Sequence, residues 1–188
     1  MDCLKQGFEV FKRNPIEWTI VGLLYGALQM TGIGTIFLGN FIRMARKSGE
    51  TGASPEISEL FQFDHIADDV VTLLLVAAAS VVGLAVCGIG AIIAGYLTFW
   101  AMHLNADGLF TPVDCIKASF HHAKSNLIQI FITTLVLGLC VGLGTILTCG
   151  LGAMVATPIL ILSFERFYAA NREDILATAA TAGVLRKV

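Results

Sequence analysis

The stretch VVTLLLVAAASVVGLAVCGIGA, residues 70–91, decides the fold class of this chain. Residues 70–86 carry no charge, and a helix needs roughly 20 apolar residues to cross a bilayer. Gly88 and Gly90 then interrupt the pattern, because paired glycines tolerate positive φ and lower helix stability. The stretch therefore predicts a membrane helix that ends in a glycine turn, from which a second membrane helix returns as far as Met102.

Two further apolar blocks show the same arrangement, from Ile16 to Ile42 and from Leu127 to Phe164, with glycine pairs at residues 31–35 and 149–153. Of the whole chain, 56% of residues are hydrophobic and 14% are charged, whereas soluble proteins carry about 25% charged residues. We therefore predict an all-α, polytopic membrane bundle in a single domain over residues 1–188. It has about six membrane segments, arranged as three glycine-turn hairpins, and the returning arm of the first hairpin is short enough to be a partial span.

An internal repeat accompanies the predicted hairpins. Asp2-Cys3-Leu4-Lys5 aligns with Asp114-Cys115-Ile116-Lys117, and the residues that follow continue to match. In this alignment an amphipathic interfacial helix precedes each hairpin, with apolar residues at helical spacing on one face and charged residues on the other. The predicted repeats cover roughly residues 1–47, 54–106 and 111–170, and residues 171–188 form a cytoplasmic tail.

Prolines mark the predicted helix starts. Asn14-Pro15, Ser54-Pro55 and Thr111-Pro112 each place a capping side chain before a proline at the first helical position. Pro158 lies inside the last apolar block instead. There it removes a backbone hydrogen bond, so we expect a kink in the last membrane helix.

The basic residues all lie away from the glycine turns. By the positive-inside rule, both termini and the amphipathic helices face the cytoplasm. Such helices commonly lie in the membrane interface with their bases toward the lipid headgroups, although packing against the bundle would give the same pattern. The predicted headgroup contacts are Lys5, Lys12, Arg13, Arg43, Arg46, Lys47, Lys117 and Lys124.

A candidate polar cluster comes from ionisable residues near the ends of the apolar blocks. Ionisable residues inside a bilayer are costly and often functional, but these lie at the level of the headgroups, where capping and anchoring are the favoured interpretation. Imidazole and carboxylate groups are suitable metal ligands, yet the spacing does not bring them together, so no metal and no catalytic residue is predicted. The cluster consists of His103, Asp107, His121, Glu165 and Arg166.

The five cysteines are odd in number and form no CxxC pair, so a disulfide framework is not expected. Whether Cys87 and Cys149 pair stays open, because they occupy matching positions at two predicted turns. The N-terminus shows no removable signal, since charges precede any apolar stretch.

Two segments carry a resemblance to a known family. The run from Gly52 to Phe61, and Asp107-Gly108-Leu109 followed by a helix with Lys124 and Asn126, resemble bacterial membrane proteins of unknown function that are related to the membrane domain found beside glycerophosphoryl diester phosphodiesterases. The resemblance implies a multi-pass bundle in the bacterial inner membrane. It carries no established activity and no catalytic residue to this chain.

These observations predict a small integral inner-membrane protein that is a non-enzymatic accessory or scaffold module. Membrane lipid or a partner protein would meet its cytoplasmic amphipathic helices. A small oligomeric transporter or channel is the alternative, and a homo-oligomer stays open because Gly22 and Gly26 have the GxxxG spacing that promotes helix contact. The net charge of −2 gives no footprint for nucleic acid, and no cofactor is predicted.

Overall fold

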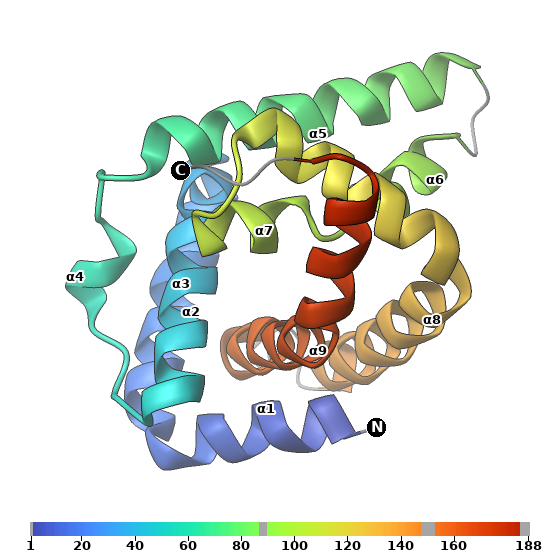
Figure 1. The fold of residues 1–188 in the computed structure, drawn as a ribbon. Coiled ribbons are helices and arrows are strands. Elements are labelled where there is room, and N and C mark those ends of the chain that lie inside the picture. Colours follow the sequence, from blue (N-terminus) through green and yellow to red (C-terminus); the bar gives the residue numbers. More distant parts are fainter. Residues whose placement is uncertain (1, 87–89, 148–152, 185–188) are drawn as a thin grey trace. The chain divides into compact units, whose positions relative to one another are not determined.

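The computed structural model describes residues 2–86, 90–147 and 153–184, and all regular secondary structure in these ranges is helical (Figure 1). The predicted all-α class is therefore confirmed. The second and third predicted glycine turns fall mostly outside the described residues, and so do Cys87 and Cys149.

The chain divides into two compact units. Unit 1 consists of residues 1–63 and 133–170, and unit 2 consists of residues 64–132 and 171–188. Two long helices, α8 (Pro112–Leu147) and α9 (Ala153–Thr181), contribute residues to both units. The remaining helices are α1 (Asp2–Arg13), α2 (Pro15–Met30), η1 (Ile33–Phe37), α3 (Leu38–Thr51) and α4 (Ile57–Leu60) in unit 1, and α5 (Ile66–Val86), α6 (Gly90–Leu97) and α7 (Ala101–Asp107) in unit 2.

Aromatic side chains join α2 to α3 in unit 1. Trp18 stacks on Phe41 with ring centroids 6.0 Å apart, and Tyr25 meets the same ring edge-on at 4.7 Å. Trp18 and Phe41 are fully buried. Gly32 ends α2 with a φ of 77°, a left-handed conformation that glycine adopts without steric cost. The chain therefore turns at the first predicted glycine pair, and α3 packs back on α2.

The second predicted amphipathic helix is much shorter than expected. Only α4 forms there, and it starts at Ile57 rather than directly after Ser54. The side-chain amide of Asn40, on α3, donates hydrogen bonds to the carbonyl oxygens of Leu60 at 3.0 Å and Gln62 at 2.6 Å. These contacts hold the chain after α4 in a non-helical path, which the local sequence does not encode.

The helix starts at Pro15 and Pro112 are confirmed. The Thr111 hydroxyl accepts a hydrogen bond from the backbone N–H of Asp114 at 3.3 Å, which is the capping contact that we expected. At the other start, Asn14 makes no side-chain cap. Helix α8 breaks at Asn126, where φ is −121° and ψ is 22°, so the amphipathic part of α8 ends where the apolar block begins.

Helix α9 continues beyond the third predicted repeat. It contains Pro158 and extends to Thr181, so the first part of the predicted tail is helical. Ile175 and Ala179, one turn apart, are fully buried in unit 2. Residues 171–181 therefore pack against unit 2 through an apolar face.

Glycine allows α1 to pack closely on α9 in unit 1. A Cβ added at Gly7 would lie 2.5 Å from Ser163 Oγ and 2.8 Å from Ser163 N, and the backbone atom cannot move aside as a flexible side chain would. In unit 2, Gly83 and Gly90 make a similar backbone contact between α5 and α6. By contrast, a Cβ at Gly26 meets no atom within 4 Å.

We therefore expect Gly7→Ala to lower the free energy of unfolding by about 1–3 kcal/mol, the usual cost of overpacking. Gly26→Ala is the matched control, because it also lies in a helix but has open space. It should leave stability unchanged or raise it by up to about 1 kcal/mol. Denaturant unfolding in mild detergent measures both values. Equal effects of the two substitutions would contradict the close packing of α1 on α9.

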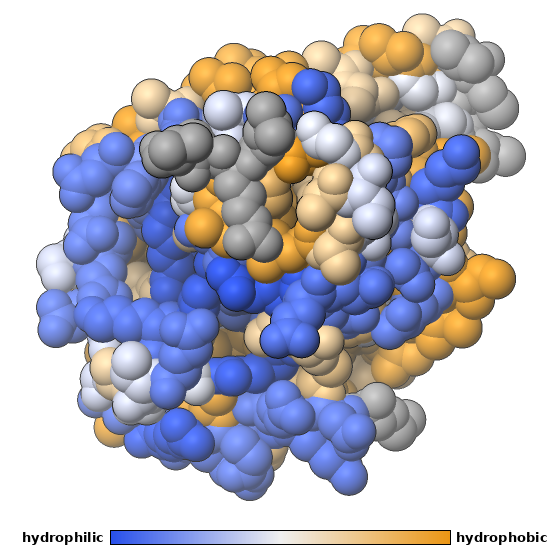
Figure 2. Space-filling model, in the orientation of Figure 1, coloured by the Kyte–Doolittle hydropathy of each residue, from blue (hydrophilic) through white to orange (hydrophobic). Residues whose placement is uncertain are grey.

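Two described helices are long and apolar enough to cross a membrane, Ile66–Ala85 in α5 and Pro112–Cys140 in α8. Only 11% and 17% of their most apolar windows are buried within the protein. Figure 2 shows hydrophobic residues on the surface over α5 and along α8. These helices are consistent with membrane association and account for two of the six predicted segments. The exposed large side chains on them include Leu74, Val81, Val82, Leu84, Ile128, Phe131, Ile132, Leu135 and Leu139.

Candidate functional site

Arg46, one of the predicted headgroup contacts, makes a buried ion pair in unit 1. Its Nε donates a hydrogen bond to Glu165 Oε1 at 2.6 Å, and the exposed fractions of the two side chains are 15% and 4%. The guanidinium also lies 5.1 Å from the centre of the Tyr168 ring, within range of a cation–π interaction. Glu165 of the predicted polar cluster is thus part of the contact between α3 and α9.

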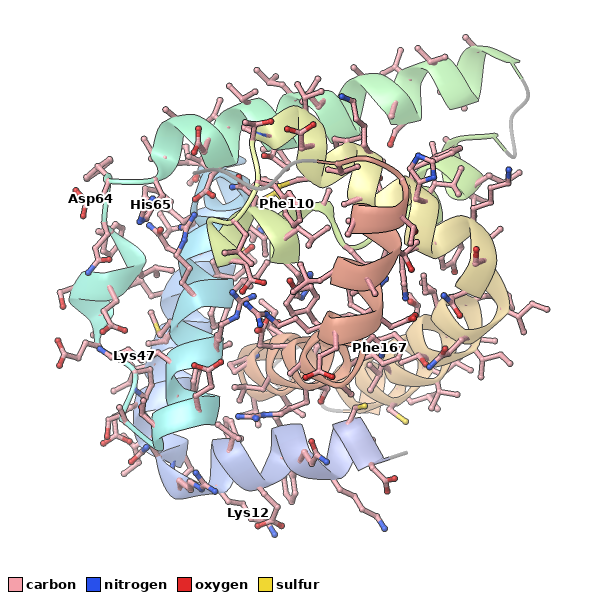
Figure 3. All side chains as sticks on the ribbon, in the orientation of Figure 1. Lys12, Lys47, Asp64, His65, Phe110 and Phe167 are labelled. Atoms are coloured by element: carbon pink, nitrogen blue, oxygen red, sulfur yellow. The ribbon has the colours of Figure 1, made fainter. Side chains whose placement is uncertain are left out.

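Two other predicted headgroup contacts on α3 bind neighbouring side chains. Arg43 Nη1 donates to Asn40 Oδ1 at 2.7 Å. Lys47 pairs with Glu59 of α4 and lies on the side of α3 that faces this helix (Figure 3). The hydrogen bond that Lys47 donates to Glu59, together with the negative charge of Glu59, raises the pKa of Lys47. These groups line a small hollow of about 250 Å³ in unit 1.

A second hollow in unit 1, of about 280 Å³, is lined by residues of α1, α3 and α9. Three basic side chains line it, Lys5, Arg13 and Arg166. Within the described part of the chain, none of the three makes a hydrogen bond or an ion pair. The carboxylate of Glu9 is also present, and it accepts a hydrogen bond from Lys12 at 3.0 Å. The hollow therefore combines several positive charges with few internal acceptors.

The remaining predicted headgroup contacts lie on the surface. Lys12 is half exposed on α1 and points away from the rest of unit 1 (Figure 3). Lys117 is paired with Asp114, one turn earlier on α8, at 3.3 Å, and Lys124 is exposed. Exposed pairs of this kind contribute about 0–1 kcal/mol to stability, so these side chains can meet external groups at little cost.

Unit 2 contains a hydrogen-bonded network around His122. Trp100 Nε1 donates to His122 Nδ1 at 3.0 Å, and His122 Nε2 lies 3.0 Å from Asp174 Oδ2. An indole N–H can only donate, so Nδ1 is the acceptor and the ring proton resides on Nε2, from which it is donated to Asp174. Both ring nitrogens are therefore engaged within the protein. This arrangement fixes the ring and leaves neither nitrogen to act on a substrate.

Ser119 completes this network by fixing the start of α7. Its hydroxyl accepts a hydrogen bond from the backbone N–H of Trp100 at 3.0 Å and donates one to the carbonyl of Leu97 at 2.9 Å. Ser119 and Trp100 are both fully buried. Side chains of α8 thus satisfy backbone groups that would otherwise be buried without partners at the beginning of α7.

Two more polar contacts hold the C-terminal part of α7 in unit 2. Asn105 Nδ2 donates to Asp69 Oδ1 at 2.6 Å, and both residues are buried. Arg172 Nε donates to Asp107 Oδ2 at 2.9 Å. Asp107 is thereby paired with a residue of the predicted tail, so its role is to anchor α9 within unit 2.

The predicted polar cluster is divided between the two units. His103, Asp107 and His121 belong to unit 2, whereas Glu165 and Arg166 belong to unit 1. His103 is buried against the rings of Phe99 and Trp100, and His121 is exposed beside Phe120.

Several polar residues of these networks were not anticipated from the sequence, namely Trp100, Asn105, Arg172 and Asp174. For Arg172 and Asp174 the sequence contains a helix signal, because the neighbouring Ile175 and Ala179 have the i, i+4 spacing of a packed helix. The prediction of a tail over residues 171–188 did not use this signal. Trp100 and Asn105 carry no such local signal, because their partners lie on other helices.

Possible metal ligands and two cysteine thiols are the remaining candidates for chemistry. In residues 2–86, 90–147 and 153–184, no three His, Cys, Asp or Glu side chains form a group that could hold a metal ion. Burial raises the pKa of the Cys3 thiol, which disfavours the reactive thiolate. Cys115, its counterpart in the predicted repeat, is fully buried.

The comparisons with known proteins leave the family open. No protein family, curated protein or solved structure matches this chain. The resemblance to the membrane domain found beside glycerophosphoryl diester phosphodiesterases therefore stays a prediction.

Proposed function

We propose that this chain is a membrane-embedded, non-enzymatic accessory module that contacts lipid. The observation that carries the proposal is the exposure of the two helices of spanning length. A core helix of a soluble protein is mostly buried, whereas the windows of α5 and α8 are 11% and 17% buried. Exposed apolar helix faces of this length need an apolar environment, and a bilayer supplies one.

The proposed bundle has six membrane segments arranged as three hairpins. Two contacts support this arrangement. Helices α2 and α3 pack through Trp18 and Phe41, and helices α5 and α6 approach each other at Gly83 and Gly90. Small residues such as Gly83 and Gly90 are characteristic of contacts between membrane helices, since they let the two backbones come close.

The proposed orientation places both termini on the cytoplasmic side of the bacterial inner membrane. Helix α1 supports it, because its buried residues lie on one face and its charged side chains on the other. Phe8 is 43% exposed beside this charged face, and Lys12 lies 4.7 Å from its ring centre. An aromatic ring next to exposed bases suits the interface between headgroups and acyl chains.

An accessory role fits the way in which the polar residues are used. Glu165 and Asp107, two ionisable residues at the ends of the apolar blocks, make contacts that hold helices together. The alternative, an oligomeric transporter or channel, would use the same embedded bundle. A partner helix, from a second copy or another membrane protein, would have room at Gly95 and Gly138, where an added Cβ meets no atom within 4 Å.

The experiment introduces a charge in the middle of α5. Leu74 is 63% exposed, and arginine at the centre of a spanning helix costs about 2.5–3.5 kcal/mol of insertion free energy. We therefore expect Leu74→Arg to remove most of the chain from the membrane fraction that resists alkaline extraction. Ile57→Arg is the control, because Ile57 is exposed on α4, outside the proposed membrane segments.

The two variants separate a membrane helix from a soluble one. Ile57→Arg should leave the membrane fraction unchanged. If Leu74→Arg instead yields as much membrane-resident protein as the wild type, or if the wild type is extracted as a soluble protein, α5 does not span a bilayer and the proposal is wrong.

A further inference from the structure

We propose that the hollow lined by Lys5, Arg13 and Arg166 in unit 1 binds a phosphate-bearing anion. The three bases come from two helices that are distant in the sequence, α1 and α9, and they line one concave site. Lys5, Glu9 and Arg13 are spaced four residues apart, so they share one face of α1. Gln6 and Val10, beside this face on α1, also line the hollow.

Two glycines, Gly49 in α3 and Gly52 directly after it, leave room for the two arginine side chains. A side chain at Gly49 would overlap the guanidinium of Arg166. At Gly52, where φ is 73°, an added Cβ would lie 3.3 Å from Arg13 Nη1. The Arg166 guanidinium therefore lies directly over the backbone at Gly49, and Arg13 Nη1 lies close to Gly52 at the end of α3.

The balance of charge favours an anion as the ligand. Three positive charges and one negative charge line the hollow, and the negative one, on Glu9, is bound by Lys12. Arginine presents its N–H groups in a planar fork that matches the oxygen atoms of a phosphate. Ligand sites commonly have volumes of about 300–1,000 Å³, so a hollow of about 280 Å³ suits a phosphate group with a small substituent.

The phosphate can come from two sources, the headgroup of an anionic phospholipid or a free phosphate compound. The lipid source rests on the proposed function, because it requires unit 1 to lie at a membrane surface. The recognition chemistry is the same in both cases. Figure 2 shows that hydrophilic residues cover the surface over α1, where either source could approach.

The test measures the thermal stability of the full chain in a zwitterionic detergent at constant ionic strength. Phosphatidylglycerol, phosphatidylcholine and inorganic phosphate are titrated separately. A ligand that binds only the folded state raises Tm in proportion to its affinity. We expect phosphatidylglycerol to raise Tm in the wild type and phosphatidylcholine to have no effect. In Arg13→Gln/Arg166→Gln the apparent affinity should fall at least tenfold, because two charge-assisted hydrogen bonds are lost.

The control is Arg186→Gln/Lys187→Gln, which removes the same charge from residues that are not among the predicted headgroup contacts. It should keep the full response to phosphatidylglycerol. Lys5→Gln, an exposed position on α1, provides a second variant in case the double arginine variant does not fold. A response to inorganic phosphate that also depends on the arginines would identify a free phosphate compound as the source.

Three outcomes would overturn the site: no response to either phosphate probe in the wild type, an undiminished response in the folded hollow variants, or an equal loss in the control pair. An equal loss in the control pair would mean that the response depends only on the overall charge of the protein. None of these outcomes affects the result for Leu74→Arg, so failure of the site and failure of the membrane proposal can be told apart.

Discussion

Glu165→Gln is expected to lower the free energy of unfolding by about 3–5 kcal/mol, the usual cost of removing one partner from a buried ion pair. The carboxylate of Glu165 is 4% exposed, and it accepts a hydrogen bond from Arg46 at 2.6 Å. Without it, the Arg46 guanidinium, whose side chain is 15% exposed, loses this carboxylate in the interior of unit 1. The loss should appear as a lower midpoint in denaturant unfolding followed by far-ultraviolet circular dichroism.

The exposed pair Lys12–Glu9 is the matched control. Its side chains are 51% and 65% exposed, so Glu9→Gln should cost less than about 1 kcal/mol. A third variant, Arg46→Met/Glu165→Leu, replaces both charges by apolar groups. Because it avoids the desolvation cost of a buried ion pair, its stability should be close to that of the wild type. If Glu165→Gln were as mild as Glu9→Gln, the ion pair would not hold α3 to α9.

The second large effect is expected at Trp100, which is fully buried in unit 2. Trp100→Ala should cost about 3–5 kcal/mol, because it leaves a cavity of nearly a whole indole ring. Trp100→Phe retains most of the packing but leaves His122 Nδ1 without its donor. The unmet hydrogen bond alone should cost about 1–3 kcal/mol.

Trp18 offers a matched control for the hydrogen bond. It is equally buried, but its indole nitrogen has no hydrogen-bond partner within the described part of the chain. Trp18→Phe combines the loss of volume with the removal of an unpaired buried N–H, whereas Trp100→Phe loses volume and a hydrogen bond, so Trp100→Phe should be the more destabilising substitution. The chain has two tryptophans, so each variant keeps one fluorescent reporter. Equal costs in the two variants would contradict the proposed role of His122.

The fold class could be predicted because its signals are local. Pro15 and Pro112 each start a helix, because the φ of proline is already fixed near the helical value, whereas no helix begins at Pro55. The long uncharged run in α5 likewise favours a helix that is apolar on all sides. The length of α4 could not be predicted in this way. It depends on Asn40, which lies on another helix and binds the carbonyls of Leu60 and Gln62.

The candidate site was predicted only in part. Lys5 and Arg13 stood out as bases on an amphipathic helix, and Arg166 as a charge at the end of an apolar block. That the three line one hollow depends on how closely α1 and α3 approach α9, which glycines at positions 7 and 49 permit. A glycine in a sequence does not indicate which distant residue will fill the space that it leaves.

The sequence by itself determined the helical class, the two helices of spanning length and the separation of bases from apolar segments, because each follows from neighbouring residues. Only the tertiary structure decided which charges are neutralised and which remain available. Arg46 meets Glu165 across 119 positions of sequence, whereas Arg13 and Arg166 line a hollow without such a partner among the residues that the structure describes. The physical reason is that an ion pair depends on distances in space of a few ångströms, and those are set by helix packing.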